Sequence, residues 1–216
     1  ILHHIYGEKM QNKRGLLIVV SGPSGAGKGT VLAHTIANYP TLRYSVSVTT
    51  RKPRAGEKEG VNYYFKTLEE FEELLSKGEF LEYQKVYDNY YGTPLSKVRQ
   101  QLDEGYDVVL EIDVKGALEV KNKYPDAVMI FISPAKRETI EERLRGRSTE
   151  SEEQLKIRTK SAIEEIKQAV FYDYIVVNED ALKGAQDIIA IIEAEKCKVK
   201  NNKKFIDNLI YGGNEL

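Results

Sequence analysis

The chain has 216 residues, and its 32 basic and 33 acidic residues almost cancel to a net charge of −1. This length predicts one domain with room for a small insertion, and the balanced charge argues against a general surface for nucleic acid or membrane lipids. The single Cys197 excludes an internal disulfide and favours the reducing cytoplasm. No apolar run approaches the ~18 residues of a membrane helix, and no segment has the pattern of a secretion signal.

The first predicted elements are a buried strand and a helix. Residues 16–21 (LLIVVS) form an apolar run that predicts a strand, and residues 28–39 have the apolar spacing of a helix. The alternation in YSVSVTT at 44–50 predicts a second strand. Residues 1–14 are interpreted as an N-terminal extension and are left out of the fold prediction.

The segment at 47–93 differs in character from the rest of the chain. Residues 67–78 have helical spacing and end at a glycine, and residues 79–92 (EFLEYQKVYDNYYG) are aromatic and strand-like. Short strands and many tyrosines replace the long apolar runs seen elsewhere. We therefore expect a small inserted α+β subdomain here.

The later part of the chain alternates between helices and strands. Helices are predicted at 95–105, 115–124, 136–168 and 181–197, and strands at 107–114, 127–133 and 174–178. The strand segments are nearly continuous apolar runs, as in strands covered on both faces. The sequence therefore predicts an α/β fold: a doubly wound parallel sheet of about five strands with helices on both faces. Residues 197–216 are interpreted as a C-terminal extension, with 198–204 a solvated helix end.

A glycine-rich loop connects the first strand to the first helix. In SGPSGAGKGT, four residues separate Gly22 from Gly27-Lys28, the spacing of a phosphate-binding loop (P-loop) at a helix N-terminus. Gly29 occupies the position where Ser or Thr usually ligates Mg²⁺, which disfavours a GTPase or a motor ATPase. The residues predicted to hold the phosphates of ATP are Gly22, Pro23, Ser24, Gly25, Ala26, Gly27, Lys28, Gly29 and Thr30.

A second phosphate site is suggested by paired arginines. Arg51 and Arg54 lie in an extended loop, and guanidinium groups suit phosphate oxygens. Without their sequence context, two solvated arginines are the favoured interpretation. Aromatic segments at 63–64 and 90–91, with Glu82 between them, offer hydroxyls for a phosphate and a carboxylate for a base edge.

Several motifs in one order resemble those of guanylate kinases, over nearly all of residues 15–196. The resembling stretches are GPSGAGKGT, SVSVTTRKPRAGE, the Gly60/Tyr63/Phe65 pattern, EFLEY, NYYGTP, LEIDVKGA, RLRGRSTES and YIVVNED. The resemblance implies a core at 15–46, 94–142 and 159–196, a GMP-binding insertion at 47–93 and a mobile helical lid at 143–158. Two departures are noted, at Lys115 and Ser148.

The resemblance also implies roles for individual residues. Catalysis would rest on positive charge, and Asn178 would lie near the adenine of ATP. The implied catalytic residues are Lys28, Arg51, Arg143, Arg147 and Arg158. The implied GMP-binding residues are Ser47, Arg51, Arg54, Tyr63, Glu82, Tyr91, Thr93 and Asp113.

The implied reaction is phosphoryl transfer from ATP to GMP or dGMP with Mg²⁺. The acceptor phosphate has a second pKa of about 6, so no general base is expected. No direct protein ligand to Mg²⁺ is assigned, with Glu111 a candidate for its water shell. Two alternatives stay open: another small P-loop kinase such as adenylate kinase, and a guanylate-kinase-like binding module without catalysis. No nucleic-acid, membrane or obligate protein partner is implied.

Overall fold

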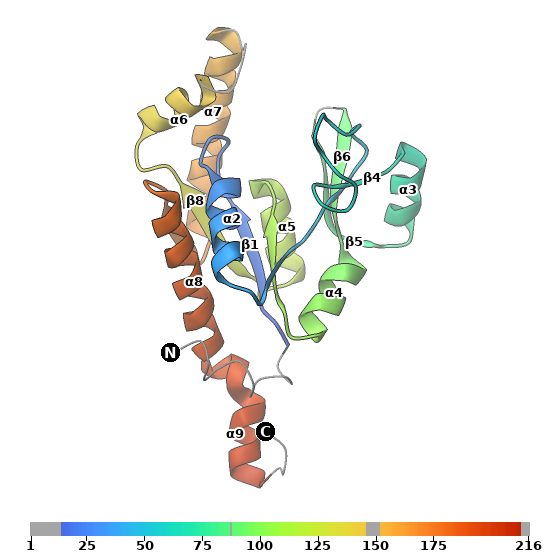
Figure 1. Ribbon diagram of the computed structural model, residues 1–216, viewed down its shortest axis with the longest axis vertical. Coiled ribbons are helices and arrows are strands. Elements are labelled where there is room, and N and C mark those ends of the chain that lie inside the picture. Colours follow the sequence, from blue (N-terminus) through green and yellow to red (C-terminus); the bar gives the residue numbers. More distant parts are fainter. Residues whose placement is uncertain (1–13, 87, 146–151, 213–216) are drawn as a thin grey trace.

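The computed structural model describes residues 14–212 except 87 and 146–151. Its core is a five-stranded sheet in the order β2-β7-β1-β8-β9, in which every neighbouring pair is parallel (Figure 1). The strands are β1 (Leu17–Ser21), β2 (Leu42–Tyr44), β7 (Asp107–Glu111), β8 (Val128–Ser133) and β9 (Tyr174–Val177). The predicted parallel α/β sheet is confirmed.

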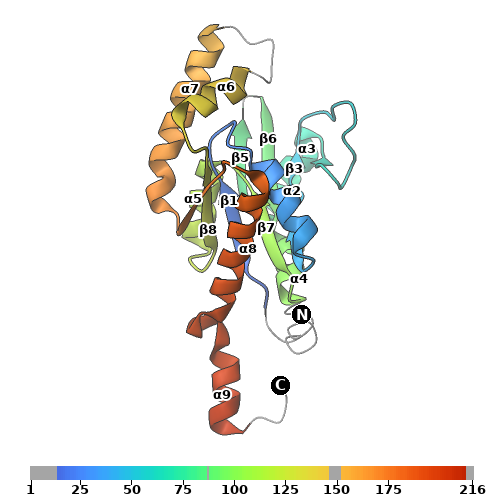
Figure 2. The same cartoon turned by 60° about the vertical axis from the view of Figure 1, so that its left-hand side comes forward.

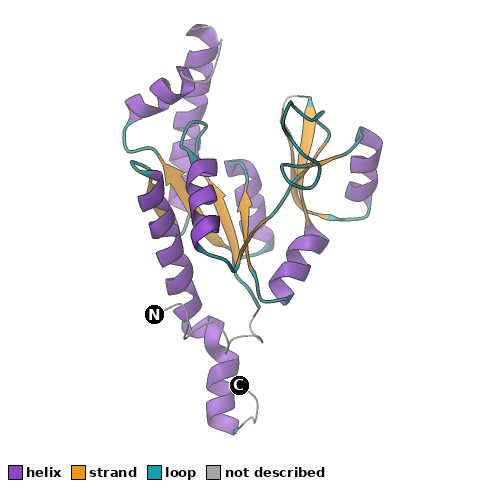
Figure 3. Cartoon of the chain, viewed as in Figure 1, coloured by secondary structure: helices purple, strands orange, loops and turns teal. Residues whose placement is uncertain are grey.

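Helices cover both faces of this sheet (Figure 3). On one face Ile18 and Val20 of β1 pack with α2 (Lys28–Asn38) and α8 (Ala181–Cys197). On the other face Leu17 and Val19 pack with α4 (Leu95–Asp103) and α5 (Val114–Lys123). Successive strand residues point to opposite faces, so a strand covered on both sides must be apolar throughout. This is why the sequence shows continuous apolar runs.

A second, smaller sheet forms beside the core within the predicted insertion. Its order is β4-β3-β6-β5, and Phe71 stacks on Phe80 beneath it with ring centroids 4.4 Å apart. The elements are β3 (Val48–Thr49), β4 (Tyr64–Phe65), α3 (Leu68–Ser76), β5 (Phe80–Val86) and β6 (Asn89–Pro94). In Figure 1 the small sheet stands to one side of the core, next to α4.

The single strand expected at 44–50 is two strands in different sheets. Leu42 of β2 is buried in the core sheet, whereas Val48 of β3 is buried in the small sheet. The Ser45 N–H still bonds to Val109 O at 3.0 Å, and the Tyr64 N–H then bonds to Ser47 O at 2.9 Å. The chain thus changes sheets within three residues, which sequence alternation alone does not reveal.

The charged zone expected as helical at 136–168 contains two helices, α6 (Arg137–Arg145) and α7 (Glu152–Lys167), followed by the 3₁₀ turn η1 (Gln168–Phe171). Ile140 of α6 packs with Leu155 and Ala162 of α7. Residues 146–151, within the predicted lid, lie outside the described residues.

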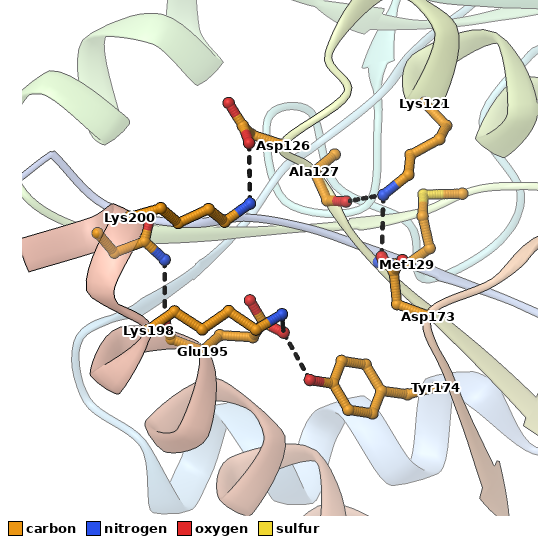
Figure 4. A network of polar contacts seen from close by, with 10 residues as sticks. Lys121, Asp126, Ala127, Met129, Asp173, Tyr174, Glu195, Lys198 and Lys200 are labelled. Carbon is orange, nitrogen blue, oxygen red and sulfur yellow. Dashed lines mark hydrogen bonds and ion pairs between the residues drawn. The ribbon is translucent and has the colours of Figure 1, made fainter.

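The chain continues as a helix beyond the predicted domain. After α8, the 3₁₀ turn η2 (Val199–Asn202) leads into a separate helix, α9 (Lys203–Tyr211) (Figure 2). Residues 198–204, expected as a solvated helix end, thus form this turn and the start of α9. Lys200 pairs with Asp126 at 2.8 Å, and the Tyr174 hydroxyl donates to Glu195 at 2.5 Å (Figure 4). These contacts hold the C-terminal segment against the body. Of the predicted N-terminal extension, only residue 14 is described.

Within the described ranges, no helix combines the length and apolar character needed to cross a bilayer.

Candidate active site

The P-loop leaves β1 and enters α2 with a backbone that glycine makes possible. Gly25 and Gly27 have φ values of 85° and 83°, in the left-handed region that glycine tolerates. At Gly22 a Cβ would lie 2.1 Å from the Ile132 carbonyl oxygen, so no larger residue fits. The Lys28 Nζ donates to the Gly22 oxygen at 2.6 Å and to the Pro23 oxygen at 3.2 Å. The ammonium group is therefore held across the loop.

Two side chains from distant segments hold the P-loop. Asn178, directly after β9, is buried and donates from Nδ2 to the Ala26 oxygen at 2.7 Å. Arg158 on α7 donates from Nη2 to the Ser24 hydroxyl at 2.9 Å. In this structure Asn178 therefore supports the loop, and its expected place near adenine stays a prediction.

An open hollow of about 400 Å³ joins the P-loop to the small-sheet side of the molecule. Besides loop residues, it is lined by Tyr63 from the insertion and by Asp113 and Glu165 from the core. Tyr44, Glu111 and Ile112 complete its lining on the core side. One space therefore faces both the P-loop and a residue predicted to bind the acceptor.

The Arg51 loop gathers three of the predicted acceptor-site residues. The Arg51 guanidinium lies 5.3 Å from the Tyr63 ring centre, and the Tyr63 ring meets the Tyr91 ring edge-on with ring centroids 5.9 Å apart. Its two terminal nitrogens donate to Glu57 at 3.0 and 2.8 Å, and the Arg54 N–H donates to the same carboxylate at 2.8 Å. These hydrogen bonds hold the pKa of Glu57 below its usual range. Arg51 is thus oriented before any phosphate arrives.

A buried carboxylate lies where β5 and β6 pair. Glu82 and Thr93 are opposite each other in the antiparallel register, and the Thr93 hydroxyl donates to Glu82 Oε1 at 2.5 Å. Burial raises the pKa of Glu82 to about 7; the Thr93 hydrogen bond opposes this shift, and the charges of Asp113 and Glu119 add to it. The site therefore contains a carboxylate that changes its charge near neutral pH.

Asp113 comes close to this carboxylate from the core. It is the N-cap of α5, and its Oδ1 accepts from the Gly116 N–H at 2.7 Å. A Cβ at Gly116 would lie 2.7 Å from Glu82 Oε2 and 3.4 Å from Asp113 Oδ1. The absence of a side chain at position 116 thus lets the helix N-terminus approach Glu82.

Comparisons with known proteins identify the family of this chain. The family model described as Guanylate kinase matches residues 14–195. A guanylate kinase of Caldanaerobacter subterraneus is 53% identical over 191 residues, covering 88% of this chain and 93% of the relative. One of Lactococcus lactis is 52% identical over 187 residues, covering 87% and 91%. The chain belongs to the guanylate kinase family.

A solved structure agrees with this membership. The guanylate kinase of Anaplasma phagocytophilum superimposes with a TM-score of 0.74 at 34% identity, covering 92% of this chain and 96% of that one. The resemblance inferred from the motifs is therefore confirmed, and the parallel sheet is that of a guanylate kinase.

The structure does not bring every expected guanylate kinase residue into contact with the site. Ser47 is half-buried, the Arg54 side chain is exposed, and Thr30 is exposed on the first turn of α2. Arg143 lies in α6, and Arg147 lies outside the described residues. Their predicted roles stay predictions.

Among the site residues that sequence reasoning missed, two are acidic. Glu57 holds Arg51, and Glu165 lines the hollow beside Lys28. Each lies in a charged stretch typical of a solvated surface. The signal that could have identified Glu57 is its position six residues after Arg51 in a Pro- and Gly-containing loop.

Proposed function

We propose that this guanylate kinase family member transfers the γ-phosphoryl group of ATP to GMP and dGMP, giving ADP and the corresponding diphosphate. The observation that carries the proposal is a hollow lined both by the P-loop and by Tyr63 and Asp113, with the Glu82–Thr93 pair close to Asp113 across Gly116. Two nucleotides bound from these two sides would meet there.

Guanine recognition would rest on Glu82. Guanine offers donors at N1–H and at the 2-amino group, which a carboxylate accepts, and a hydroxyl such as that of Thr93 can donate to O6. Adenine lacks the N1–H and reverses the polarity at position 6. An unmatched buried polar group costs about 1–3 kcal/mol, so AMP is disfavoured and the adenylate kinase alternative with it.

Catalysis would come from positioning and positive charge, as expected for a loose phosphoryl-transfer transition state. Lys28 would contact the β- and γ-phosphates, Arg51 and Arg54 the acceptor phosphate, and Arg143, Arg147 and Arg158 the transferred group. At pH 7 the acceptor phosphate is mostly dianionic, so no residue needs to remove a proton. Closure of the helices around 143–158 would exclude water.

The residues present fit a Mg²⁺ ion carried mainly by phosphates and water. Glu111 lines the hollow, and a Cβ at Gly29 would lie 3.9 Å from both of its carboxylate oxygens. Among the described residues, no three His, Cys, Asp or Glu side chains gather as a metal site. Glu111 would hold the ion through water. When bound, Mg²⁺ supplies neutralising charge at the β- and γ-phosphates.

The binding-module alternative is disfavoured by the intact P-loop, because a scaffold that does not transfer phosphate has no need for Lys28. An acceptor screen with ATP and Mg²⁺ across GMP, dGMP, AMP and gluconate tests the proposal. GMP should be the best acceptor; faster turnover of AMP or gluconate would contradict the proposal.

Cys197 is exposed and free in the structure, and we place the enzyme in the cytoplasm.

GMP binding should weaken as the pH falls through 7. Guanine donors favour the ionised form of Glu82, whose pKa is about 7 in the free protein. Between pH 8 and pH 6 the ionised fraction falls about tenfold, so KM for GMP should rise by about that factor. The measurement is KM for GMP at saturating ATP from pH 6 to 8.

The matched control for this pH series is Glu82→Gln. In this variant the GMP phosphate still titrates near pH 6, but residue 82 no longer titrates. The dependence of KM for GMP on pH should therefore be weaker than in the unsubstituted enzyme. The stability of the ligand-free protein should depend on pH in the opposite direction, falling as the pH rises. Because the folded pKa of Glu82 is raised from 4.5 to about 7, its stabilising protonation is lost as the pH rises through 7. An equally steep profile for Glu82→Gln would contradict the assignment.

Replacing Gly116 with alanine should impair GMP binding selectively. The new Cβ would meet Glu82 Oε2 at 2.7 Å, so the carboxylate must move from its place beside Thr93. We expect KM for GMP to rise about tenfold, the cost of one weakened charged hydrogen bond, with KM for ATP unchanged. Lys115→Ala, at the exposed neighbouring position, is the control and should leave both constants unchanged. Equal losses for ATP and GMP would point to a general disturbance of α5 instead.

A further inference from the structure

One side of helix α5 is turned toward strand β5 of the small sheet. Gly116, Glu119 and Lys123 are separated by three and four residues, so they lie on the same side of the helix. At the first of these positions, a Cβ on Gly116 would lie 2.7 Å from Glu82 Oε2. The helix whose N-terminus faces the site therefore also runs along the strand that carries Glu82.

Strand β5 is irregular directly before Glu82. Between Phe80 and Glu82 the register advances by two residues on β5 but by one residue on β6. Leu81 is thus the extra residue of a β-bulge, a feature that bends a strand and re-aims its side chains. The Leu81 side chain is buried in the core cluster, and its carbonyl oxygen accepts from Lys123 Nζ at 3.0 Å. Helix α5 therefore holds the bulge from the core side.

A second hydrogen bond joins the two elements on the other side of Glu82. Gln84 Nε2 donates to Glu119 Oε1 at 2.6 Å. Gln84 is buried and Glu119 is half-buried, and a hydrogen bond to a charged acceptor is among the strong ones. Gln84 and Glu82 are two residues apart on the strand, so their side chains share a face. Contacts at positions 81 and 84 thus bracket Glu82.

The charge of Glu119 by itself is unfavourable for guanine binding. It adds to the rise in the pKa of Glu82 and so favours the protonated form, whereas the guanine donors require the ionised form. Any benefit that Glu119 brings to GMP binding must therefore come through its hydrogen bond to Gln84. The charge and the hydrogen bond act in opposite directions on KM for GMP, and substitutions can separate them.

We propose that Glu119 is a positioning residue for guanine recognition, which fixes β5 against α5 through Gln84 and so sets the place of the Glu82 carboxylate. This inference rests on the GMP kinase function proposed above and deepens it. It assigns Glu119 no contact with either nucleotide.

Five variants test the proposal. Glu119→Ala removes the acceptor, Gln84→Ala removes the donor, and a double variant combines these two. Glu119→Gln keeps an acceptor oxygen without the charge. The control is Asn122→Ala, at an exposed position of α5. Steady-state kinetics at pH 7 should give kcat, KM for ATP and KM for GMP, and calorimetry without ATP should give Kd for GMP. Circular dichroism melts should show that each variant is folded.

Loss of the hydrogen bond should act on GMP and not on ATP. For Glu119→Ala and Gln84→Ala we expect KM and Kd for GMP to rise about fivefold, with kcat and KM for ATP within about twofold. Because both variants remove the same hydrogen bond, the double variant should be no more than about twofold worse than either one. Glu119→Gln should bind GMP as well as the unsubstituted enzyme or better, and Asn122→Ala should match that enzyme.

Four results would each overturn the inference. They are an unchanged or lowered KM for GMP in Glu119→Ala, equal losses for ATP and GMP, losses that multiply in the double variant, and a Glu119→Gln enzyme as impaired as Glu119→Ala. A lowered KM would mean that only the charge of Glu119 matters. If the unsubstituted enzyme failed to phosphorylate GMP, the proposed function would fail instead, and the Kd values for GMP would still test Glu119.

Discussion

Replacing Lys28 with alanine should lower kcat by about 10²- to 10³-fold, the range for removing one preorganised charged donor from a transition state. The Lys28 ammonium group lies across the P-loop, bonded to the Gly22 and Pro23 carbonyl oxygens. There it can follow charge that moves onto the β,γ-bridging oxygen. KM for GMP should change less than about twofold, since the acceptor side is built from other residues. The measurement is steady-state kinetics with ATP and GMP varied separately.

The control for this variant must separate charge from loop structure. Lys28→Met keeps the aliphatic stem and removes the charge, and it should lose as much activity as alanine. Lys183→Ala, on the exposed surface of α8, should retain full activity. Survival of turnover in both Lys28 variants would show that Lys28 does not have the role given to it here.

The parts of the site that the sequence predicts well are local in the chain. The P-loop is contiguous, and three of its glycines answer a backbone need: Gly25 and Gly27 have left-handed φ values, and Gly22 lies against the Ile132 carbonyl. Glu82 and Thr93 are eleven residues apart, yet the β5–β6 hairpin register places them opposite each other. The resemblance identified both residues. The hairpin explains why they act as a pair.

The parts that the sequence does not predict depend on packing between distant segments. Arg158 and Ser24 are 134 residues apart, and nothing in an acidic helix distinguishes Glu165 from a solvated carboxylate. The same limit applies to the fold. Residues 44–50 alternate like one strand, but Tyr44 ends β2 of the core sheet and Val48 begins β3 of the small sheet. Periodicity indicates that a residue is buried, but it does not indicate which segment the residue packs against.

Replacing Glu82 with alanine should raise KM for GMP by about 10²-fold and reduce the preference for GMP over AMP by a similar factor. The carboxylate would accept from two guanine donors, and hydrogen bonds to a charged group contribute about 1.5–3 kcal/mol each. Adenine offers no N1–H to this position, so turnover of AMP should be little affected. The measurement is kcat/KM for GMP and for AMP in parallel, with ATP saturating.

The raised pKa of Glu82 in the ligand-free protein allows this test to separate a loss of recognition from a loss of stability. Because burial holds the Glu82 pKa near 7, the ionised carboxylate is costly without a ligand, and alanine should leave the free protein as stable or more stable above pH 7. A fall in GMP affinity together with an unchanged or raised melting temperature would therefore assign the loss to recognition. Glu72→Ala, an exposed substitution on α3, should change neither quantity. An unchanged ratio of GMP to AMP turnover in Glu82→Ala would remove Glu82 from base selection and leave Asp113 as the remaining carboxylate at the N-terminus of α5.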